Sequence, residues 1–279
     1  MAQLPVRGPA VRKLDLSLPP ERMPCRLGSR PLKRWRYVGV YTTDVMLCVG
    51  EAWIGPVPQR WWAVATPDGA LRERTTFGRG GVTLDGSAVR VQAEGVSIEL
   101  ELDEHDGVEI VSPVDEGGDY IWTRKQACLA ARGTVELDGR RHEIDGPVGF
   151  IDDSAGYHAR HTEWRWSAGI GTLDDGRLVG WNLVAGIHDA ASSSERTLWI
   201  DHDPVSVAPV EFAADLSEVS FADGRALEFY EWSAREHSTN AWLVRSGYRQ
   251  PFGTFTGELP GGLRLAEGFG VMEHHEALW

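Results

Sequence analysis

Residues 152–169 read D-D-S-A-G-Y-H-A-R-H-T-E-W-R-W-S-A-G, and the stretch continues as I-G-T-L-D-D-G-R-L-V-G-W-N-L-V to residue 184. Successive side chains of a strand point to opposite faces. Trp164 and Trp166 therefore share one face, and Ser167 lies on the other. Asp175-Gly176 is a strong hairpin signal because a type I′ turn needs positive φ at both central positions. The stretch predicts two antiparallel strands joined by a tight turn.

The strand after this turn repeats the contrast between large and small side chains. Trp181 and Leu183 fall on one face, and Gly180 and Asn182 on the other. Glycines beside large aromatic side chains allow a sheet to curl and another backbone to approach closely. The aromatic side chains either fill a core or line a ligand site, and the pattern leaves both interpretations open. As candidates for ligand binding we take Trp62, Tyr157, Trp164, Trp166, Trp181 and Asn182.

Turn signals recur along the rest of the chain. Between them lie short aromatic and β-branched stretches, such as W-R-Y-V-G-V-Y at residues 35–41, which are typical of strands. No run of ten or more residues has clear helical periodicity, and residues 126–131 are the one candidate for a short helix. These features predict an all-β, antiparallel fold. Asp-Gly or Gly-Gly turns begin at Asp68, Asp85, Asp106, Asp138, Asp175, Asp223 and Gly261.

The two halves of the chain share a sequence pattern. A tryptophan pair followed by an Asp-Gly turn occurs at residues 61–69 and, more loosely, at residues 164–176. The polar loop of residues 137–145 ends near Gly146, so we expect one β-barrel over residues 1–145 and a second over residues 146–279. Residues 1–31 are rich in Pro and Arg, which predicts a loose N-terminal arm laid over the first barrel.

The composition of the 279 residues is that of a globular protein, with 42% hydrophobic and 25% charged residues. The net charge of −13 argues against a nucleic-acid groove and against an anionic membrane surface, since both need clustered Lys and Arg. Twelve tryptophans favour a neutral or apolar small molecule as the partner. Three widely spaced cysteines indicate no disulfide framework. With no apolar leader and no apolar run of membrane-spanning length, we expect a cytoplasmic protein without a membrane span.

The candidates for acid–base chemistry are Asp152, His158 and Glu273. Protonation of a carbon atom needs a carboxylic acid that burial or a like-charged neighbour keeps neutral, together with aromatic faces that stabilise a cation. Asp152 and Asp153 are adjacent, so on a strand they point to opposite faces. The alternative is that one of them caps a loop by accepting hydrogen bonds from backbone N–H groups. His158 has the parity of the Trp164 face if the chain is already extended there.

Other kinds of site receive less support from the sequence. His158, His161, Glu163 and the run Glu273-His274-His275 could supply metal ligands, but ligands three apart on a strand face opposite ways, so we expect no metal. Ser154 lacks the surroundings of a nucleophile elbow, and Cys48 lies in an apolar strand. No phosphate-binding loop or dinucleotide motif is present, so we expect no cofactor.

Several stretches resemble known families. Gly149-Phe150-Ile151-Asp152, Trp164-x-Trp166 and the Asp-Gly hairpin resemble the carotenoid-hydratase/AttH-like group, which includes tocopherol-cyclase-like proteins. Most of the chain resembles the actinobacterial DUF2804 family, in P-Q-R-W-W-A-V-A (58–65), D-D-S-A-G-Y-H-A-R-H-T (152–162), Y-R-Q-P-F-G-T-F (248–255) and G-V-M-E-H-H (270–275). The resemblance implies two tandem lipocalin-like β-barrels that hold a ligand near their junction, with Asp152 at the Gly-x-x-Asp position.

Three functions agree with these features. The first is a cofactor-independent lyase or isomerase that hydrates, cyclises or isomerises a hydrophobic metabolite of isoprenoid or polyketide type. The second is a non-catalytic carrier of the same ligand, which the fold permits equally. The third is a protein that binds or processes carbohydrate, because tryptophan faces with carboxylates also suit sugars.

Overall fold

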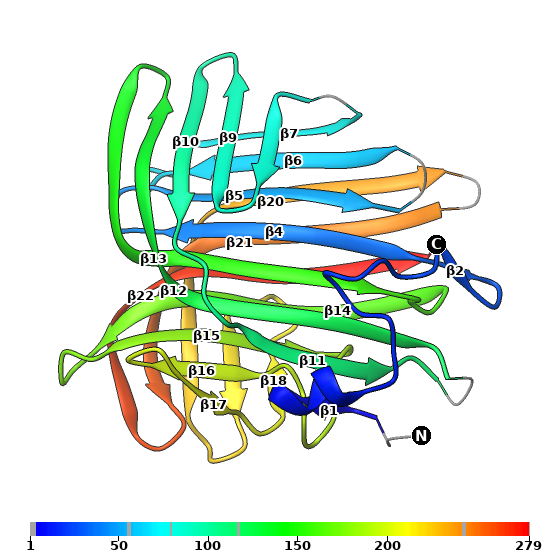
Figure 1. Cartoon of the computed structure of the whole chain (residues 1–279). Coiled ribbons are helices and arrows are strands. Elements are labelled where there is room, and N and C mark those ends of the chain that lie inside the picture. The colour runs from blue at the N-terminus through cyan, green and yellow to red at the C-terminus, as the bar shows by residue number, and fades with distance from the viewer. Residues whose placement is uncertain (1–3, 55–56, 79, 116–117, 242–243, 279) are drawn as a thin grey trace.

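The computed structural model describes residues 4–54, 57–78, 80–115, 118–241 and 244–278. These residues form two antiparallel sheets, a small hairpin of β2 (Arg26–Leu27) and β3 (Arg30–Pro31), and one short 3-10 helix, η1 (Gly8–Lys13) (Figure 1). Within the described ranges no helix reaches the length and apolarity of a membrane-spanning helix.

The first sheet is built mainly from the N-terminal half of the chain. Its strand order is β7-β6-β5-β4-β13-β12-β10-β9-β8, and β11 joins β12 and β1 at one end. The sheet curls until β8 contacts β5 and β6. Its strands are β1 (Val6–Arg7), β4 (Lys33–Tyr41), β5 (Met46–Trp53), β6 (Pro58–Ala65), β7 (Leu71–Phe77), β8 (Val82–Asp85), β9 (Ala88–Ala93), β10 (Val96–Leu102), β11 (Val108–Pro113), β12 (Tyr120–Leu137) and β13 (Arg140–Gly156).

The second sheet uses the remainder of the chain in the order β17-β16-β15-β14-β22-β21-β20-β19-β18. It curls in the same way, so that β18 contacts β15. The prediction of an all-β chain with two tandem antiparallel barrels is confirmed, with each barrel present as a curled half-barrel. The strands are β14 (His161–Leu173), β15 (Leu178–Ala185), β16 (Thr197–Ile200), β17 (Asp203–Ser206), β18 (Val210–Phe212), β19 (Glu218–Phe221), β20 (Ala226–Ala241), β21 (Val244–Leu259) and β22 (Leu263–Leu278).

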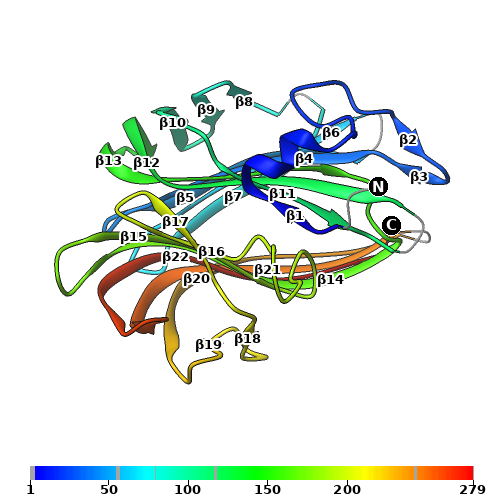
Figure 2. The same ribbon diagram turned by 60° about the horizontal axis from the view of Figure 1, so that its bottom comes forward.

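The two curled sheets lie face to face, as Figure 2 shows, and this creates three apolar layers. One layer fills the inside of the first sheet, one fills the inside of the second, and the third fills the space between the sheets, which we call the junction. Trp62 lies in the first inner core, Trp181 in the second, and Trp166 in the junction. The alternation predicted for the hairpin is confirmed: Trp166 pairs with Val184 on one face, and Gly169 pairs with Trp181 on the other.

Residues 126–131 are not helical, contrary to the sequence-based prediction. They belong to β12, whose register with β13 shifts on both sides of Leu129. This irregular part of β12 meets β15 of the other sheet, where a Cβ on Gly180 would lie 2.7 Å from the Ala127 Cβ and 2.8 Å from the Cys128 Sγ. Gly180 therefore permits the close contact between the sheets, because any side chain there would collide with the bulge.

The N-terminal arm is packed instead of loose. Val11, Leu18 and Met23 are buried against β11 and β12 of the first sheet. Arg7 donates hydrogen bonds to the carbonyl oxygens of Ser194 (2.6 Å) and Arg196 (3.0 Å), which belong to the second half of the chain. The arm thus ties the two sheets together at one end of the junction.

The division expected after residue 145 remains a prediction about folding units. Position 146 lies inside β13, and that strand stays paired with β4 of the first sheet up to Gly156. The chain passes from the first sheet to the second between Gly156 and His161.

Candidate functional site

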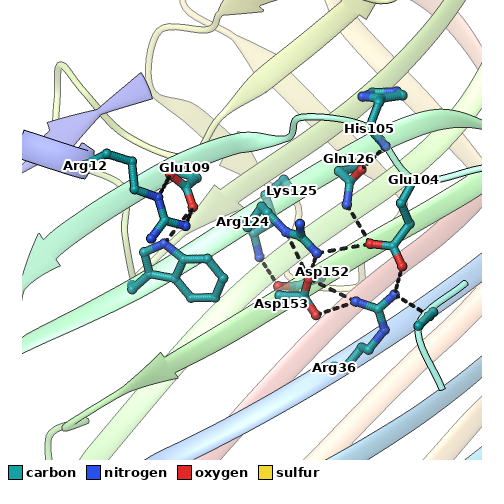
Figure 3. A network of polar contacts seen from close by, with 12 residues as sticks. Arg12, Arg36, Glu104, His105, Glu109, Arg124, Lys125, Gln126, Asp152 and Asp153 are labelled. Carbon is teal, nitrogen blue, oxygen red and sulfur yellow. Dashed lines mark hydrogen bonds and ion pairs between the residues drawn. The ribbon is translucent and has the colours of Figure 1, made fainter. Parts of the chain in front are cut away.

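The two adjacent aspartates of β13 point to opposite faces of the first sheet, as the alternation predicts. Asp152 lies on the junction face and forms an ion pair with Lys125, at 2.5 Å from Oδ1 to Nζ. Asp153 lies on the inner face and accepts hydrogen bonds from Arg36 and Arg124 (Figure 3). The alternative that one of them caps a loop is wrong, because both sit inside a paired strand and bind side-chain cations.

A group of buried ionisable side chains surrounds Asp152. Lys125 is 3% exposed, and its ammonium also lies 3.4 Å from Glu195 Oε1. Burial would lower the pKa of Lys125, but the charges of Asp152 and Glu195 raise it above its ordinary value, so the lysine stays charged. Burial raises the pKa of Asp152, and the charge of Glu195 adds to this effect while Lys125 opposes it. Two carboxyl groups thus share one buried ammonium.

Glu273 of β22 adds a third carboxyl group from the second sheet. Its two oxygens accept hydrogen bonds from Trp164 Nε1 and Gln250 Nε2, each at 2.8 Å. Burial raises the pKa of Glu273 to about 7, and the charge of Asp152 contributes in the same direction. Glu273 therefore holds or releases its proton near neutral pH, as a general acid must.

Two tyrosines of β4 continue this polar group along the junction. The hydroxyl groups of Tyr37 and Tyr41 are 3.1 Å apart, and Tyr37 is the cross-strand neighbour of Asp152. Tyr41 folds back over Gly39, where a Cβ would lie 2.3 Å from the Tyr41 hydroxyl, so only glycine leaves room for the pair. Burial raises the pKa of both tyrosines well above the ordinary value, and both phenols stay protonated.

A cavity of about 650 Å³ opens between the sheets and reaches Tyr41. Its wall comes from the β4–β5 turn, from the β12–β13 hairpin and from β14, β15 and β22 of the second sheet. Tyr41 also interacts electrostatically with both Glu273 and Asp152. Tyr41 therefore belongs both to the cavity wall and to the polar group that begins at Tyr37, whereas Asp152, Lys125 and Glu273 lie behind it and do not line the cavity.

The aromatic side chains predicted for the hairpin organise the same region. Trp166 packs edge-on against Tyr37 and Phe150, with ring centroids 5.4 Å and 5.8 Å apart. Its indole N–H donates to Asn182 Oδ1 at 2.8 Å, and Asn182 Nδ2 donates to the carbonyl oxygen of Glu195 at 3.0 Å. This chain of hydrogen bonds holds Glu195, which lies in the loop between β15 and β16.

Several polar atoms in this part of the junction have no hydrogen-bond partner among the residues that the structure describes. They include Thr123 Oγ1, Ser154 Oγ, His188 Nε2 and Glu195 Oε2, all buried. Thr123 and Ser154 are cross-strand neighbours on the face that carries Lys125 and Asp152. Buried polar groups without a partner are rare in proteins, and a catalytic role or a bound water or ion is among the usual reasons for them.

The remaining predicted residues lie at the border of this group or outside it. His158 is in the loop between β13 and β14, so strand parity does not extend to it. Its ring centroid lies 4.8 Å from that of Trp35, the cross-strand neighbour of Ser154, and burial lowers the pKa of His158 well below the ordinary value. Tyr157 donates a hydrogen bond to the carbonyl oxygen of Pro24 in the N-terminal arm. Trp62 and Trp181 lie in the two inner cores. The structure thus brings together Asp152, Glu273, Trp164, Trp166 and Asn182, places His158 next to them beside Trp35, and separates Tyr157, Trp62 and Trp181 from them.

The sequence also contained signals for residues that the predictions left out. Tyr37 and Tyr41 have the same strand parity within an aromatic run, which places both on one face. Lys125 follows the strand-like run I-W-T at residues 121–123 and precedes the apolar run A-C-L-A-A at 127–131, where a lysine needs a buried partner. Glu195 lies in a polar loop and carries no such signal.

The histidines near the chain end form exposed cross-strand pairs. His274 Nε2 lies 3.0 Å from Glu163 Oε1, and His161 Nε2 lies 2.9 Å from Glu276 Oε1. Among the described residues, no three His, Cys, Asp or Glu side chains are grouped so that they could hold a metal ion.

Comparison with known proteins gives a family and a fold. The family described as "Domain of unknown function (DUF2804)" matches residues 72–279. An AttH-like protein of Nitrosomonas europaea has a TM-score of 0.54 and 13% identity, over 94% of this chain and 99% of the other. Kievitone hydratase of Nectria haematococca has a TM-score of 0.50 and 11% identity, over 87% of this chain and 88% of the other. No curated protein matches the sequence. At these identities the likeness concerns the fold.

Proposed function

The chain belongs to the DUF2804 family, whose description assigns no reaction, and from its site we propose that it binds a hydrophobic small metabolite at the junction of its two sheets and performs cofactor-independent acid–base chemistry on it. The observation that carries the proposal is Glu273, a buried carboxylic acid whose pKa is raised to about 7, beside the Asp152–Lys125 ion pair. The fold it shares with a hydratase supports the same class of reaction.

The chemistry begins with transfer of a proton to a carbon–carbon double bond. The π electrons of the alkene form a new C–H bond with the proton of Glu273, which becomes a carboxylate. Trp166 and Phe150 offer aromatic faces to the resulting carbocation. In hydration, water adds to the cation and its surplus proton returns to Glu273. In cyclisation, the π electrons of a second double bond form a C–C bond with the cation, and the new cation then loses a neighbouring proton to the Glu273 carboxylate. In isomerisation, the first cation loses a different neighbouring proton to that carboxylate.

The other residues of the site hold the proton and the substrate in place. The charge of Asp152 raises the pKa of Glu273, and the ion pair with Lys125 opposes the rise that burial causes in the pKa of Asp152. The Tyr37–Tyr41 pair connects these groups to the cavity of about 650 Å³, which has the volume of a small-molecule site. His158 is buried with a lowered pKa, so in this proposal it is a neutral neighbour and takes no proton.

Incubation in D₂O with a panel of isoprenoid and polyketide-type alkenes tests the proposal. We expect a product with deuterium on carbon, detected by mass spectrometry and NMR, and no such product from Glu273→Gln. Glu276→Gln, an exposed position on the same strand, is the matched control and should keep the parent rate. If the protein retains an alkene whose mass is unchanged, the protein is a carrier, and the proposed catalysis is contradicted. Retention of sugars alone would contradict the choice of ligand.

A further inference from the structure

A second cavity, of about 1070 Å³, lies at the mouth of the first sheet, on the face away from the junction. We call it the mouth pocket. One wall is the inner face of β4, β5, β12 and β13, and the other wall is the N-terminal arm, with Met23 and Leu32. Both neighbours of Ala155 along β13 belong to the opposite face, so the pocket and the junction site are separated by the sheet itself.

The deep end of the mouth pocket is closed by a row of ion pairs. Across the sheet, Glu51, Arg36, Asp153 and Arg124 are successive cross-strand neighbours. Asp153 accepts from Arg36 at 2.9 Å and from Arg124 at 2.7 Å, and Glu104 binds both arginines (Figure 3). The two arginines are therefore matched by two carboxylates. This row separates the pocket from the apolar inner core, so a ligand cannot enter that core as it does in an open barrel.

The next row toward the mouth has a different character. Trp53, Arg34, Ala155 and Trp122 are successive cross-strand neighbours on the same face. The row crosses four strands spaced about 4.8 Å apart, so its two tryptophans lie roughly 14 Å from each other. Arg34 and the small Ala155 occupy the two positions between them. The row thus has a tryptophan at each end and a low floor between them. Trp122 is largely buried under the arm, with Arg12 over its ring at 6.0 Å, so Trp53 is the more accessible of the two.

Arg34 is the only charged side chain in this row. Its guanidinium stacks over the Trp53 ring at 5.1 Å, and no carboxylate among the described residues pairs with it. The neighbouring pocket arginine, Arg12, is by contrast bound to Glu109. In a chain with a net charge of −13, an arginine that faces a cavity without an acidic partner is available to an anion. Guanidinium groups bind carboxylates through two parallel hydrogen bonds.

We propose that the mouth pocket binds a small organic carboxylate with a flat apolar body. The carboxylate lies on Arg34, and the body lies between the Trp53–Trp122 row and the arm residues Met23 and Leu32. This is a second binding site, independent of the acid–base site in the junction, because Arg34 and Ala155 face away from Asp152 and Glu273.

Binding of 2-naphthoate to the full chain, measured by calorimetry and by tryptophan fluorescence, tests the proposal, with neutral 2-naphthol as the matched ligand. We expect saturable binding of 2-naphthoate at one site and at least tenfold weaker binding of 2-naphthol. Arg34→Gln should weaken 2-naphthoate at least tenfold and leave 2-naphthol nearly unchanged. Trp53→Ala should weaken both ligands. Arg74→Gln, an exposed arginine of β7 outside the pocket, should change neither.

The outcomes separate this site from the junction site. Asp152→Asn should leave 2-naphthoate affinity at the parent value, whereas a loss in that variant would place the ligand in the junction and overturn the proposal. Equal binding of 2-naphthoate to the parent and to Arg34→Gln would overturn it as well, as would binding that does not saturate. Arg34→Lys retains the charge without the paired hydrogen bonds, so it should fall between the parent and Arg34→Gln. Circular dichroism of each variant shows whether its fold is intact.

Discussion

Asp152 and Asp153 are neighbours in the chain, yet they sit in opposite electrostatic surroundings. On the junction face, Asp152 and Glu195 share the buried ammonium of Lys125, and the buried Glu273 lies within reach of the charges of Asp152 and Arg235. On the inner face, Asp153 lies between two arginines at the edge of an open pocket. Because side chains alternate along one strand, Asp152 faces a region where burial raises the pKa of carboxyl groups, whereas Asp153 faces a region of ion pairs with arginine.

The difference teaches that the charge balance of each face, more than the residue type, decides what a carboxyl group can do. Where carboxyl groups outnumber cations and water is excluded, burial and like charge raise the pKa, as at Glu273. Where arginines match the carboxylates, each ion pair is neutral and its role is to hold the walls of a pocket. The predictions below test this contrast.

Replacing a cation should have the largest effect on the free energy of unfolding. That effect should be much larger for Lys125 on the junction face than for Arg124 on the inner face. Lys125→Met leaves Asp152 and Glu195 buried without a counter-charge, which should lower the free energy of unfolding by about 3–5 kcal/mol. Arg124→Met should cost only about 1 kcal/mol, because Arg36 still pairs with Asp153 and the pair is partly open to solvent. Urea denaturation of both variants measures the two values, and equal losses would remove the contrast.

Glu273 should make stability depend on pH. Its pKa is about 7 in the folded chain against 4.5 for an ordinary glutamate, so between these values the folded state binds more protons than the unfolded state. The free energy of unfolding should therefore fall as pH rises from 4.5 to 7, by roughly 3 kcal/mol in total from this group. Glu273→Gln should remove that dependence, and Glu276→Gln should retain it. Denaturation at several pH values checks this, and the same slope in both variants would contradict it.

The influence of Asp152 on Glu273 should appear as a shift in titration. Asp152→Asn removes a negative charge and leaves Lys125 less neutralised, and both changes favour ionised Glu273. We expect the pKa of Glu273 to fall by about one unit, which corresponds to about 1.4 kcal/mol. Carbon-13 NMR of labelled glutamate, with Glu273→Gln to assign the signal, measures the shift. An unchanged or higher pKa would mean that the two carboxyl groups do not sense each other.

The tyrosine pair should show the smallest effect on stability. Tyr41→Phe removes the hydroxyl that Tyr37 faces at 3.1 Å, and a buried hydrogen bond contributes about 1 kcal/mol. If the pair links the cavity to Glu273, turnover should fall far more than stability does. Tyr230→Phe, an exposed tyrosine of β20, is the control and should change neither quantity. If Tyr41→Phe turns over substrate at the parent rate, the tyrosine pair takes no part in the reaction.

Much of the fold followed from local patterns, whereas the site followed from them only in part. Asp-Gly turns and period-two alternation predicted antiparallel strands, and the alternation also separated Asp152 from Asp153 and Trp166 from Trp181. Parity relates residues within one strand or hairpin, however, and His158 lay beyond the end of β13, where parity no longer applies. The short helix predicted for residues 126–131 failed because contact with the other sheet imposes a bulged strand there.

The sequence by itself thus determined the all-β class, the paired strands and the two sides of each strand, because side-chain alternation and turn chemistry act over a few residues. Only the tertiary structure decided which side faces the junction, and hence that Lys125 meets Asp152 and Glu195, that Asp152 influences Glu273, and that Arg34 faces a pocket with no carboxylate of the described residues paired to it. Those residues come from strands and loops far apart in the chain. Their proximity depends on how two curled sheets pack, and no local pattern encodes that arrangement.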